Sequence, residues 1–422
     1  MFGRMRAAVT ILLAGLGAVA AGSVRPPNVV LIISDDQGYA DFGFLGHPHI
    51  RTPHLDRLAR QGAVFPHGYV TVPLCRPSLA SILTGRYAHQ LGICGNDPPD
   101  GVNRSSSDRF LRDVPTIPRL LARAGYRSLQ TGKWWEGSFA NGGFTDGMTP
   151  AGERHGGPGL AIGRESLRPI YDFIESAERG NAPFFVWYAP MLPHEPHNPP
   201  ERILRKYLVP GRNERLARYW AMCEWFDETC GELVNWLDRR RLLDNTMIVF
   251  LVDNGWIQAT QPTSRGAGGF APRSKRTPYE GGVRTPVVVW RPGHVRPGRY
   301  DDLVSSVDVA PTILRACNVA PPAEMAGLDL CDLANGRPHA ARNAVFGEVF
   351  LHTDAVLGDP GRNLTHRWVR EGRWKLIVPA DPAAAAELYD LVKDPDEERN
   401  AAATASDVMT RLRRVLDAWW SP

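Results

Sequence analysis

The chain has 422 residues, of which 43% are hydrophobic and 22% charged, so its composition is that of a globular protein and not of a disordered chain. Lysine and arginine number 49 against 45 aspartate and glutamate residues, and a net charge this small gives no argument for a nucleic-acid partner. The six cysteines are scattered along the chain, which excludes a dense disulfide framework. The length predicts one large domain with a smaller appendage.

The first residues, MFGRMRAAVTILLAGLGAVAAGS, begin with two arginines, continue as an apolar run and end in small residues. This order is typical of a secretory signal peptide, which we place over residues 1–22. An uncleaved membrane anchor is the alternative, but the apolar run is short for a span and contains Gly15 and Gly17. We therefore expect an exported protein, periplasmic or secreted, with no stable membrane span.

Four apolar, β-branched runs have the pattern of buried parallel strands: NVVLIIS (28–34), PFFVWYAP (183–190), NTMIVFLVDNG (245–255) and TPVVVW (285–290). Helical patterns lie between them, at 52–62, 116–125 and about 212–241. Strands that alternate with helices predict an α/β fold with a doubly wound, mostly parallel sheet flanked by helices. We assign this main domain to residues 23–340.

After about residue 340 the pattern changes to short strand-like segments, AVFGEV, HRWVREGRWKLIV and ELYDLVKDPDEERN. An amphipathic helix is predicted from about Ser406 to Trp420. The sequence thus predicts a small C-terminal antiparallel sheet plus helix over residues 341–422, packed on the main domain.

Acidic residues follow two of the predicted strands. Asp35 and Asp36 come directly after the first strand, and Asp253 and Asn254 follow a later one. Ligands of open α/β sheets bind beyond the carboxyl ends of strands, and adjacent carboxylates repel one another unless a cation neutralises them. This all-oxygen set suits calcium best and magnesium second. Taken alone, each pair is equally compatible with an ordinary acidic turn after a strand.

The stretch VPLCRPSLASILTGRYAHQ places Cys75 at the start of a predicted helix. Pro77 is suited to open that helix and Gly85 to end it, so the positive end of the helix faces Cys75. Such a position favours an anion. For an isolated C-x-P-S segment, the alternative is a loop cysteine before a capped helix.

The sequence resembles the type I sulfatases, which use a formylglycine and belong to the alkaline phosphatase superfamily. The similarity covers most of the chain after the signal segment, in NVVLIISDDQGYADFGFLG, TPHLDRLARQGAVFPHGYV, CRPSLASILTGR, GYRSLQTGKW, PFFVWYAPMLPHEPHNPP, DNTMIVFLVDNG, KRTPYEGGVRTPVVVWRPG and ELYDLVKDPDEERN. In that family a maturation enzyme oxidises the cysteine of a C-x-P-x-R motif to formylglycine, whose hydrate attacks sulfur. Cys75 occupies the matching position.

The resemblance also implies roles for the residues around Cys75. Lys133 and Lys275 would clamp the sulfate, and His194 would bind the sulfate or protonate the leaving alcohol. The calcium ligands would be Asp35, Asp36, Asp253, Asn254 and the formylglycine oxygen at position 75. Judged by residue type alone, the two lysines are equally compatible with surface cations and His194 with a loop histidine.

Two positions depart from the family pattern. Leu79 replaces the motif arginine, and Trp135 replaces a histidine that usually follows the first sulfate-binding lysine by two residues. One interpretation is a divergent site in which Arg76 or another cation compensates and the Trp135 indole shapes a sugar-binding wall. The other is a protein whose Cys75 is not converted. The glycine-rich segment 153–157 predicts a further loop near the pocket.

These features together favour a sulfuric ester hydrolase that acts on a sulfated carbohydrate with a calcium ion and a formylglycine from Cys75. Its partners would be a glycan or small-molecule sulfate ester and the formylglycine-generating enzyme. The alternatives are a phosphonate or phosphodiester hydrolase of the same superfamily, or a non-catalytic protein that binds sulfated glycans.

Overall fold

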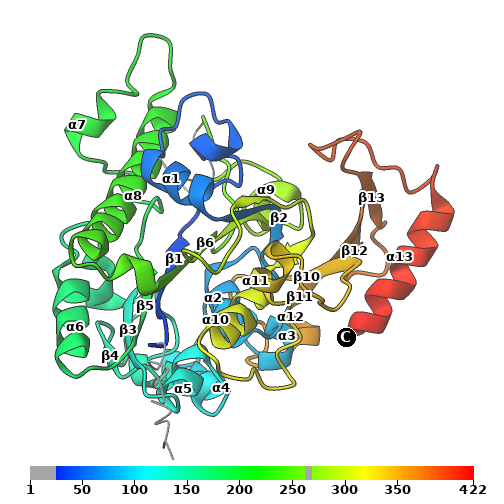
Figure 1. The fold of residues 1–422 in the computed structure, drawn as a ribbon. Coiled ribbons are helices and arrows are strands. Elements are labelled where there is room, and N and C mark those ends of the chain that lie inside the picture. The colour runs from blue at the N-terminus through cyan, green and yellow to red at the C-terminus, as the bar shows by residue number, and fades with distance from the viewer. Residues whose placement is uncertain (1–24, 262–268) are drawn as a thin grey trace, which may run out of the picture.

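The computed structural model describes residues 25–261 and 269–422, so the predicted signal segment lies outside the described residues. A nine-stranded, mostly parallel sheet forms the centre, in the order β4-β3-β5-β1-β6-β7-β2-β8, with β9 paired to β2 (Figure 1). The strands are β1 Asn28–Ser34, β2 Ala63–Tyr69, β3 Arg127–Gly132, β4 Asp146–Gly147, β5 Phe184–Ala189, β6 Thr246–Val252, β7 Arg284–Trp290, β8 Gly298–Arg299 and β9 Val304–Ser305.

The four predicted strands are β1, β5, β6 and β7, and the predicted fold class is confirmed. Strands β3, β5, β1 and β6 are parallel neighbours, so their carboxyl ends share one edge of the sheet. In contrast, β7 runs antiparallel to both β6 and β2. An apolar run does not reveal strand direction, because a central strand buried on both faces reads the same either way.

Helices cover both faces of the sheet because β1 is apolar on both sides. Val30 and Ile32 pack with α1 Pro53–Gln61, α6 Arg168–Arg179 and α8 Glu214–Arg239. Val29, Leu31 and Ile33 pack with α2 Cys75–Thr84, α5 Ile117–Ala122 and α10 Val309–Ala316. The shorter helices are α3 Ala88–Leu91, α4 Arg109–Arg112, α7 Glu201–Leu204, α9 Glu280–Val283, α11 Leu330–Ala334 and α12 Pro360–Asn363.

A separate four-stranded antiparallel sheet follows in the chain, with α13 Ser406–Trp419 on its outer side (Figure 1). Its strands are β10 Ala344–Phe350, β11 Leu364–Glu371, β12 Trp374–Pro379 and β13 Glu387–Asp390. The predicted antiparallel sheet and terminal helix are therefore present. Within the described ranges, no helix has the length and apolar character that a membrane span requires.

Buried charges join this small sheet to the main sheet. Lys375 on β12 is fully buried, and its Nζ lies 3.0 Å from an oxygen of Glu280 and 2.9 Å from one of Glu397. Glu280 belongs to α9 of the main domain and also accepts a hydrogen bond of 2.8 Å from the Tyr69 hydroxyl. The ammonium thus offsets two carboxylates that have no access to water.

We predict that Lys375→Met destabilises the fold by about 3–5 kcal/mol, because it leaves the buried Glu397 carboxylate without its cation and Glu280 with only the more distant Arg284 and Arg370. The check is the midpoint of urea or thermal unfolding. Arg168→Ala is the matched control, since Arg168 pairs with Asp172 at 2.7 Å but both side chains are more than half exposed. A Lys375→Met protein as stable as the parent would contradict the assignment of Lys375 as the tie between the two sheets.

Candidate active site

The acidic residues lie together because the strands that precede them are neighbours. Strands β1 and β6 pair in parallel with Ser34 opposite Val252, so Asp35 and Asp36 emerge beside Asp253 and Asn254. The Asp36 amide donates to Asp253 Oδ1 at 3.1 Å, and Asn254 Nδ2 donates to Asp36 Oδ1 at 2.6 Å. All four residues are at most 2% exposed. The two strand ends therefore form one buried polar cluster.

Helix α2 places Cys75 over this cluster. The helix begins at Cys75 itself, two residues before the predicted start at Pro77, and ends at Gly85, whose φ of +62° favours glycine. The Ser78 hydroxyl donates to the backbone oxygen of Asp253 at 2.5 Å, which fixes the first turn against β6. Potential ligand atoms of Asp35, Asp36, Cys75 and Asp253 lie within 4.8 Å of one another.

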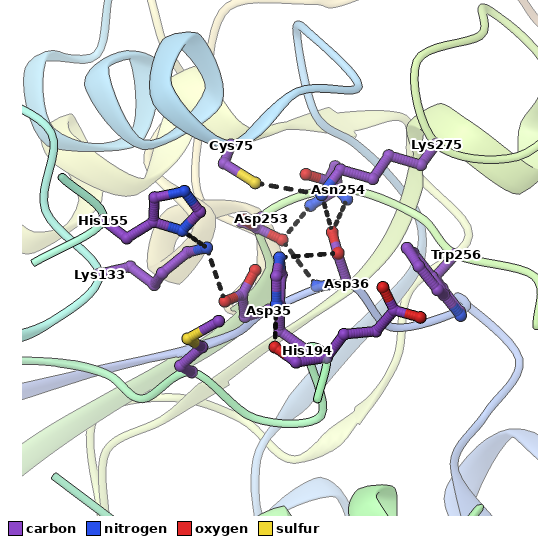
Figure 2. Close-up of polar contacts among 12 residues, drawn as sticks. Asp35, Asp36, Cys75, Lys133, His155, His194, Asp253, Asn254, Trp256 and Lys275 are labelled. Atoms are coloured by element: carbon purple, nitrogen blue, oxygen red, sulfur yellow. Dashed lines mark hydrogen bonds and ion pairs between the residues drawn. The ribbon is translucent and has the colours of Figure 1, made fainter. Parts of the chain in front are cut away.

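Three basic side chains point into the same cluster (Figure 2). Lys275 Nζ lies 2.5 Å from Asp36 Oδ1 and 3.2 Å from Cys75 Sγ. Lys133, directly after β3, places its Nζ 3.1 Å from Asp35 Oδ2. His194, in the loop after β5, has its Nε2 3.3 Å from Asp36 Oδ2. The structure thus brings together every residue that the sequence singled out for the site.

Burial and charge act against each other on the pKa values of this cluster. Burial raises the pKa of Asp36, but the charges of Lys275, His194 and Lys133 outweigh it and lower that pKa to about 2. Burial and the charges of Asp35 and Asp36 raise the pKa of Asp253 well above its usual range. Asp253 is therefore the carboxyl group whose charge is least well compensated.

Burial raises the pKa of the Cys75 thiol to about 12, although Lys275 and Lys133 act in the opposite direction. A thiol with this pKa remains protonated near neutral pH. Because the thiolate is the nucleophilic form, Cys75 is a poor nucleophile as an unmodified thiol.

The oxygen atoms left without partners fit a hard divalent cation. Asp35 Oδ1, Asp253 Oδ2 and Asn254 Oδ1 are buried, and none has a hydrogen-bond partner in the described part of the chain. A buried acceptor without a partner lowers the stability of the fold unless a cation or a hydrogen-bond donor binds it. Three carboxylates against the ammonium groups of Lys133 and Lys275 also leave negative charge in the cluster. Carboxylate and amide oxygens are the donors that calcium prefers.

The surroundings of Leu79 and Trp135 contradict two parts of the interpretation from the sequence, the compensation by Arg76 and the sugar-binding wall of Trp135. Arg76 does not replace the missing motif arginine, because its buried guanidinium binds both carboxylate oxygens of Glu136, at 2.7 and 3.0 Å. Trp135 does not form a sugar-binding wall, because it is only 3% exposed. Instead, Leu79 and Trp135 line the same small gap beside Trp134 and belong to the same apolar cluster as Cys75.

One further side chain reaches the site from the predicted loop at 153–157. His155 Nδ1 lies 3.4 Å from Lys133 Nζ, and its ring packs on Trp135 with 4.3 Å between centroids (Figure 2). The sequence signal was only a glycine-rich segment, which marks a loop but does not say which strand end it covers.

Comparisons with known proteins point to one family. The family model described as Sulfatase matches residues 27–319, and the model for the N-sulphoglucosamine sulphohydrolase C-terminal region matches residues 268–419. Human (Homo sapiens) arylsulfatase A is 31% identical over 98% of this chain and 90% of its own length. N-acetylgalactosamine-6-sulfatase of Rattus norvegicus is 30% identical over 76% of this chain and 68% of its own length.

Solved structures share the fold. The crystal structure of Ps i-CgsB in complex with k-i-k-neocarrahexaose has a TM-score of 0.76 and 25% identity, and the match covers 93% of this chain and 92% of that one. The phosphonate monoester hydrolase of Agrobacterium radiobacter has a TM-score of 0.69 and 20% identity, covering 93% of this chain and 95% of the other. The second likeness concerns the fold alone.

We predict that Asp253→Asn stabilises the metal-free protein but removes most of its stabilisation by calcium. A carboxyl group with a raised pKa weakens the metal-free fold as pH rises from its unfolded pKa through its folded pKa, so the neutral amide relieves a penalty at neutral pH. The measurement is the thermal midpoint after chelation and after calcium is restored. Asp172→Asn, on the exposed side of α6, is the control. An undiminished calcium shift in Asp253→Asn would count against this ligand.

We also predict that Leu79→Arg destabilises the protein by about 3 kcal/mol or more, because it buries a charge without a partner. Leu79 is 5% exposed, and the nearby Glu136 is already bound by Arg76. Leu79→Met, which conserves volume, is the control and is expected to change stability by less than about 1.5 kcal/mol. The test is the unfolding midpoint of both variants, and equal midpoints would show that the pocket accepts the family arginine.

Proposed function

The chain belongs to the sulfatase family, and from that premise we propose that it hydrolyses a sulfate ester of a carbohydrate with a formylglycine made from Cys75 and a bound calcium ion. The observation that carries the proposal is the convergence of Cys75 with two ammonium groups on a buried set of acceptor oxygens. Asp35, Asp36, Asp253, Asn254 and the group at position 75 would hold the cation. Magnesium is the second choice for this oxygen set.

The proposed modification gives a chemical role to a thiol that is otherwise inert. A hydrated aldehyde supplies one hydroxyl that takes up the sulfuryl group and a second whose deprotonation expels sulfate, whereas a simple alcohol would remain as a stable ester. Burial at 1% exposure and the raised pKa of Cys75 support a need for conversion. The calcium would lower the pKa of the attacking hydroxyl and neutralise developing charge.

Lys133 and Lys275 would stabilise the sulfuryl oxygens. Their ammonium groups enter from different elements, one after β3 and one before α9, and both reach the cluster beneath Cys75. Positive charge fixed in a site without water is more effective than the same charge in solvent, because the site does not reorganise during the reaction. Burial lowers the pKa of Lys133, but the charge of Asp35 acts in the opposite direction and the pKa is raised, so the ammonium stays charged.

His194 would move the proton of the leaving alcohol. Its Nδ1 lies 2.7 Å from the Glu195 carbonyl oxygen, which only accepts, so Nδ1 carries a proton and Nε2 is the nitrogen that faces the site. Protonation of the leaving alcohol requires a second proton on Nε2, so it would proceed from the charged ring; burial and Lys133 lower the pKa of His194, whereas the charges of Asp35 and Asp36 favour the charged form. A partly buried imidazole at this place is suited to proton transfer near neutral pH.

The substrate class is inferred from relatives. One relative is named an N-acetylgalactosamine-6-sulfatase, and one similar structure holds a neocarrahexaose. The first name supports a carbohydrate sulfate, and the second supports a carbohydrate ligand. We also propose that the chain is exported and matured by a formylglycine-generating enzyme. A phosphonate or phosphodiester hydrolase remains the competing activity, because a phosphonate monoester hydrolase shares the fold.

The experiment follows Cys75 in the full chain, produced in its native host or in another host that matures sulfatases. We predict that its peptide carries the formylglycine mass and reacts with a hydrazide, and that Cys75→Ala abolishes hydrolysis. Cys331→Ala is the control, since Cys331 is a free thiol on α11. Matched aryl sulfate, phosphodiester and phosphonate esters serve as substrates.

Faster turnover of the phosphorus esters would replace the sulfatase assignment with the competing hydrolase. An unmodified thiol, together with binding of sulfated glycan and no turnover, would support a non-catalytic binding protein.

A further inference from the structure

The backbone at His155 has an unusual conformation for its residue type. Its φ is +63°, in the left-handed region that costs a non-glycine residue about 1 kcal/mol or more. The adjacent Gly156 presses against the end of β3, where an added Cβ would lie 2.2 Å from the Gly132 oxygen. The His155 oxygen accepts a hydrogen bond of 3.0 Å from the Trp134 amide. The loop is thus fixed to the segment that carries Lys133.

The side chain of His155 is directed at the Lys133 ammonium. Its Nδ1 lies 3.4 Å from Lys133 Nζ, while Trp135 supports one side of its ring at a centroid distance of 4.3 Å (Figure 2). Lys133 is 1% exposed and otherwise pairs with Asp35. His155 therefore occupies a backbone position at which glycine would be unstrained. Its side chain contacts Lys133, a buried candidate for catalysis.

His155 is a neutral partner for Lys133. Burial lowers the pKa of the imidazole to about 2, and the charges of Lys133 and Arg154 act in the same direction. A neutral acceptor orients an ammonium group without cancelling its charge, whereas a carboxylate would do both. Asp35 is such a carboxylate, and it is also one of the proposed calcium ligands.

Arg154 competes for the same ring but has other partners. Its guanidinium contacts His155 Nε2 and also donates to both oxygens of Asp97, at 3.0 and 3.1 Å. A neutral imidazole has one acceptor nitrogen, so it accepts from one of the two cations at a time. Arg154 is partly exposed, so water can accept its remaining hydrogen bonds. Lys133 is buried, so a donor of its ammonium group that is left without an acceptor costs more free energy.

We propose that His155 is a positioning residue, whose neutral Nδ1 accepts a hydrogen bond from Lys133 and aims the uncancelled ammonium charge at the substrate's sulfuryl group. The part that concerns the sulfuryl group rests on the proposed function. The contact between His155 and Lys133 does not depend on it.

The test compares two substitutions that both tolerate the left-handed backbone. His155→Gly removes the side chain, and His155→Asn retains a short side chain with an acceptor near the position of Nδ1. We expect His155→Gly to lower kcat/KM for an aryl sulfate by about tenfold or more, mainly through kcat, as for a lost hydrogen bond to a charged group. His155→Asn should recover most of that loss. Metal content should not change in either variant.

Asn181→Gly is the matched control, because Asn181 is exposed, has a φ of +51° and precedes β5 at the opposite end of the sheet. It should leave activity unchanged. A His155→Gly enzyme with kcat/KM within twofold of the parent would overturn the proposal. Equal losses in His155→Gly and His155→Asn would also overturn it, since they would assign His155 to packing on Trp135.

Crystal structures of the calcium-loaded parent and of both variants separate this inference from the proposed function. Lys133 Nζ should lie within hydrogen-bond distance of residue 155 in the parent and in His155→Asn, and should move in His155→Gly. An unmoved Lys133 in His155→Gly would overturn the positioning role. Because this measurement needs no turnover, a parent that fails to hydrolyse sulfate esters would refute only the proposed function.

Discussion

Three carboxylates of like charge, withdrawn from water at the ends of two adjacent strands, are the constraint on which the site depends. Parallel pairing of β1 with β6 forces Asp35, Asp36 and Asp253 together, and their repulsion has to be offset by groups from elsewhere. Lys133 after β3 and Lys275 before α9 supply part of the offset. The remaining charge and the unpartnered oxygens account for the affinity that we expect for a divalent cation.

The sequence predicted most of this arrangement because the acidic residues of the site lie at strand ends. The apolar run before each of them shows where the strand ends in the sequence, and parallel pairing brings those ends together in space. The runs before Asp35 and Asp253 identified the strands, and Gly85 correctly marked the end of α2. Contacts between distant loops were not predictable in this way. Nothing in the sequence indicates that Arg76 pairs with Glu136, or that the loop of His155 contacts Lys133. The direction of β7 was also hidden in its apolar run.

The two departures from the family pattern belong to one packing unit. Leu79 and Trp135 face the same small gap, so an aliphatic and an aromatic side chain fill this space together. Arginine at one position without a change at the other would bring charge into an apolar environment. On this side of the site, His155 reaches Lys133 from a loop and lies over the Trp135 ring.

The burial of Cys75 also imposes an order in time. With 1% of its surface exposed beneath the first turn of α2, the thiol is out of reach of another protein once the fold is complete. The enzyme that we propose to oxidise it would have to act while that segment is still unfolded. The tie through Glu397 and Lys375 forms only after the end of the chain is available. Folding and the proposed modification would then compete, and the active fraction of a preparation would record which of the two was faster.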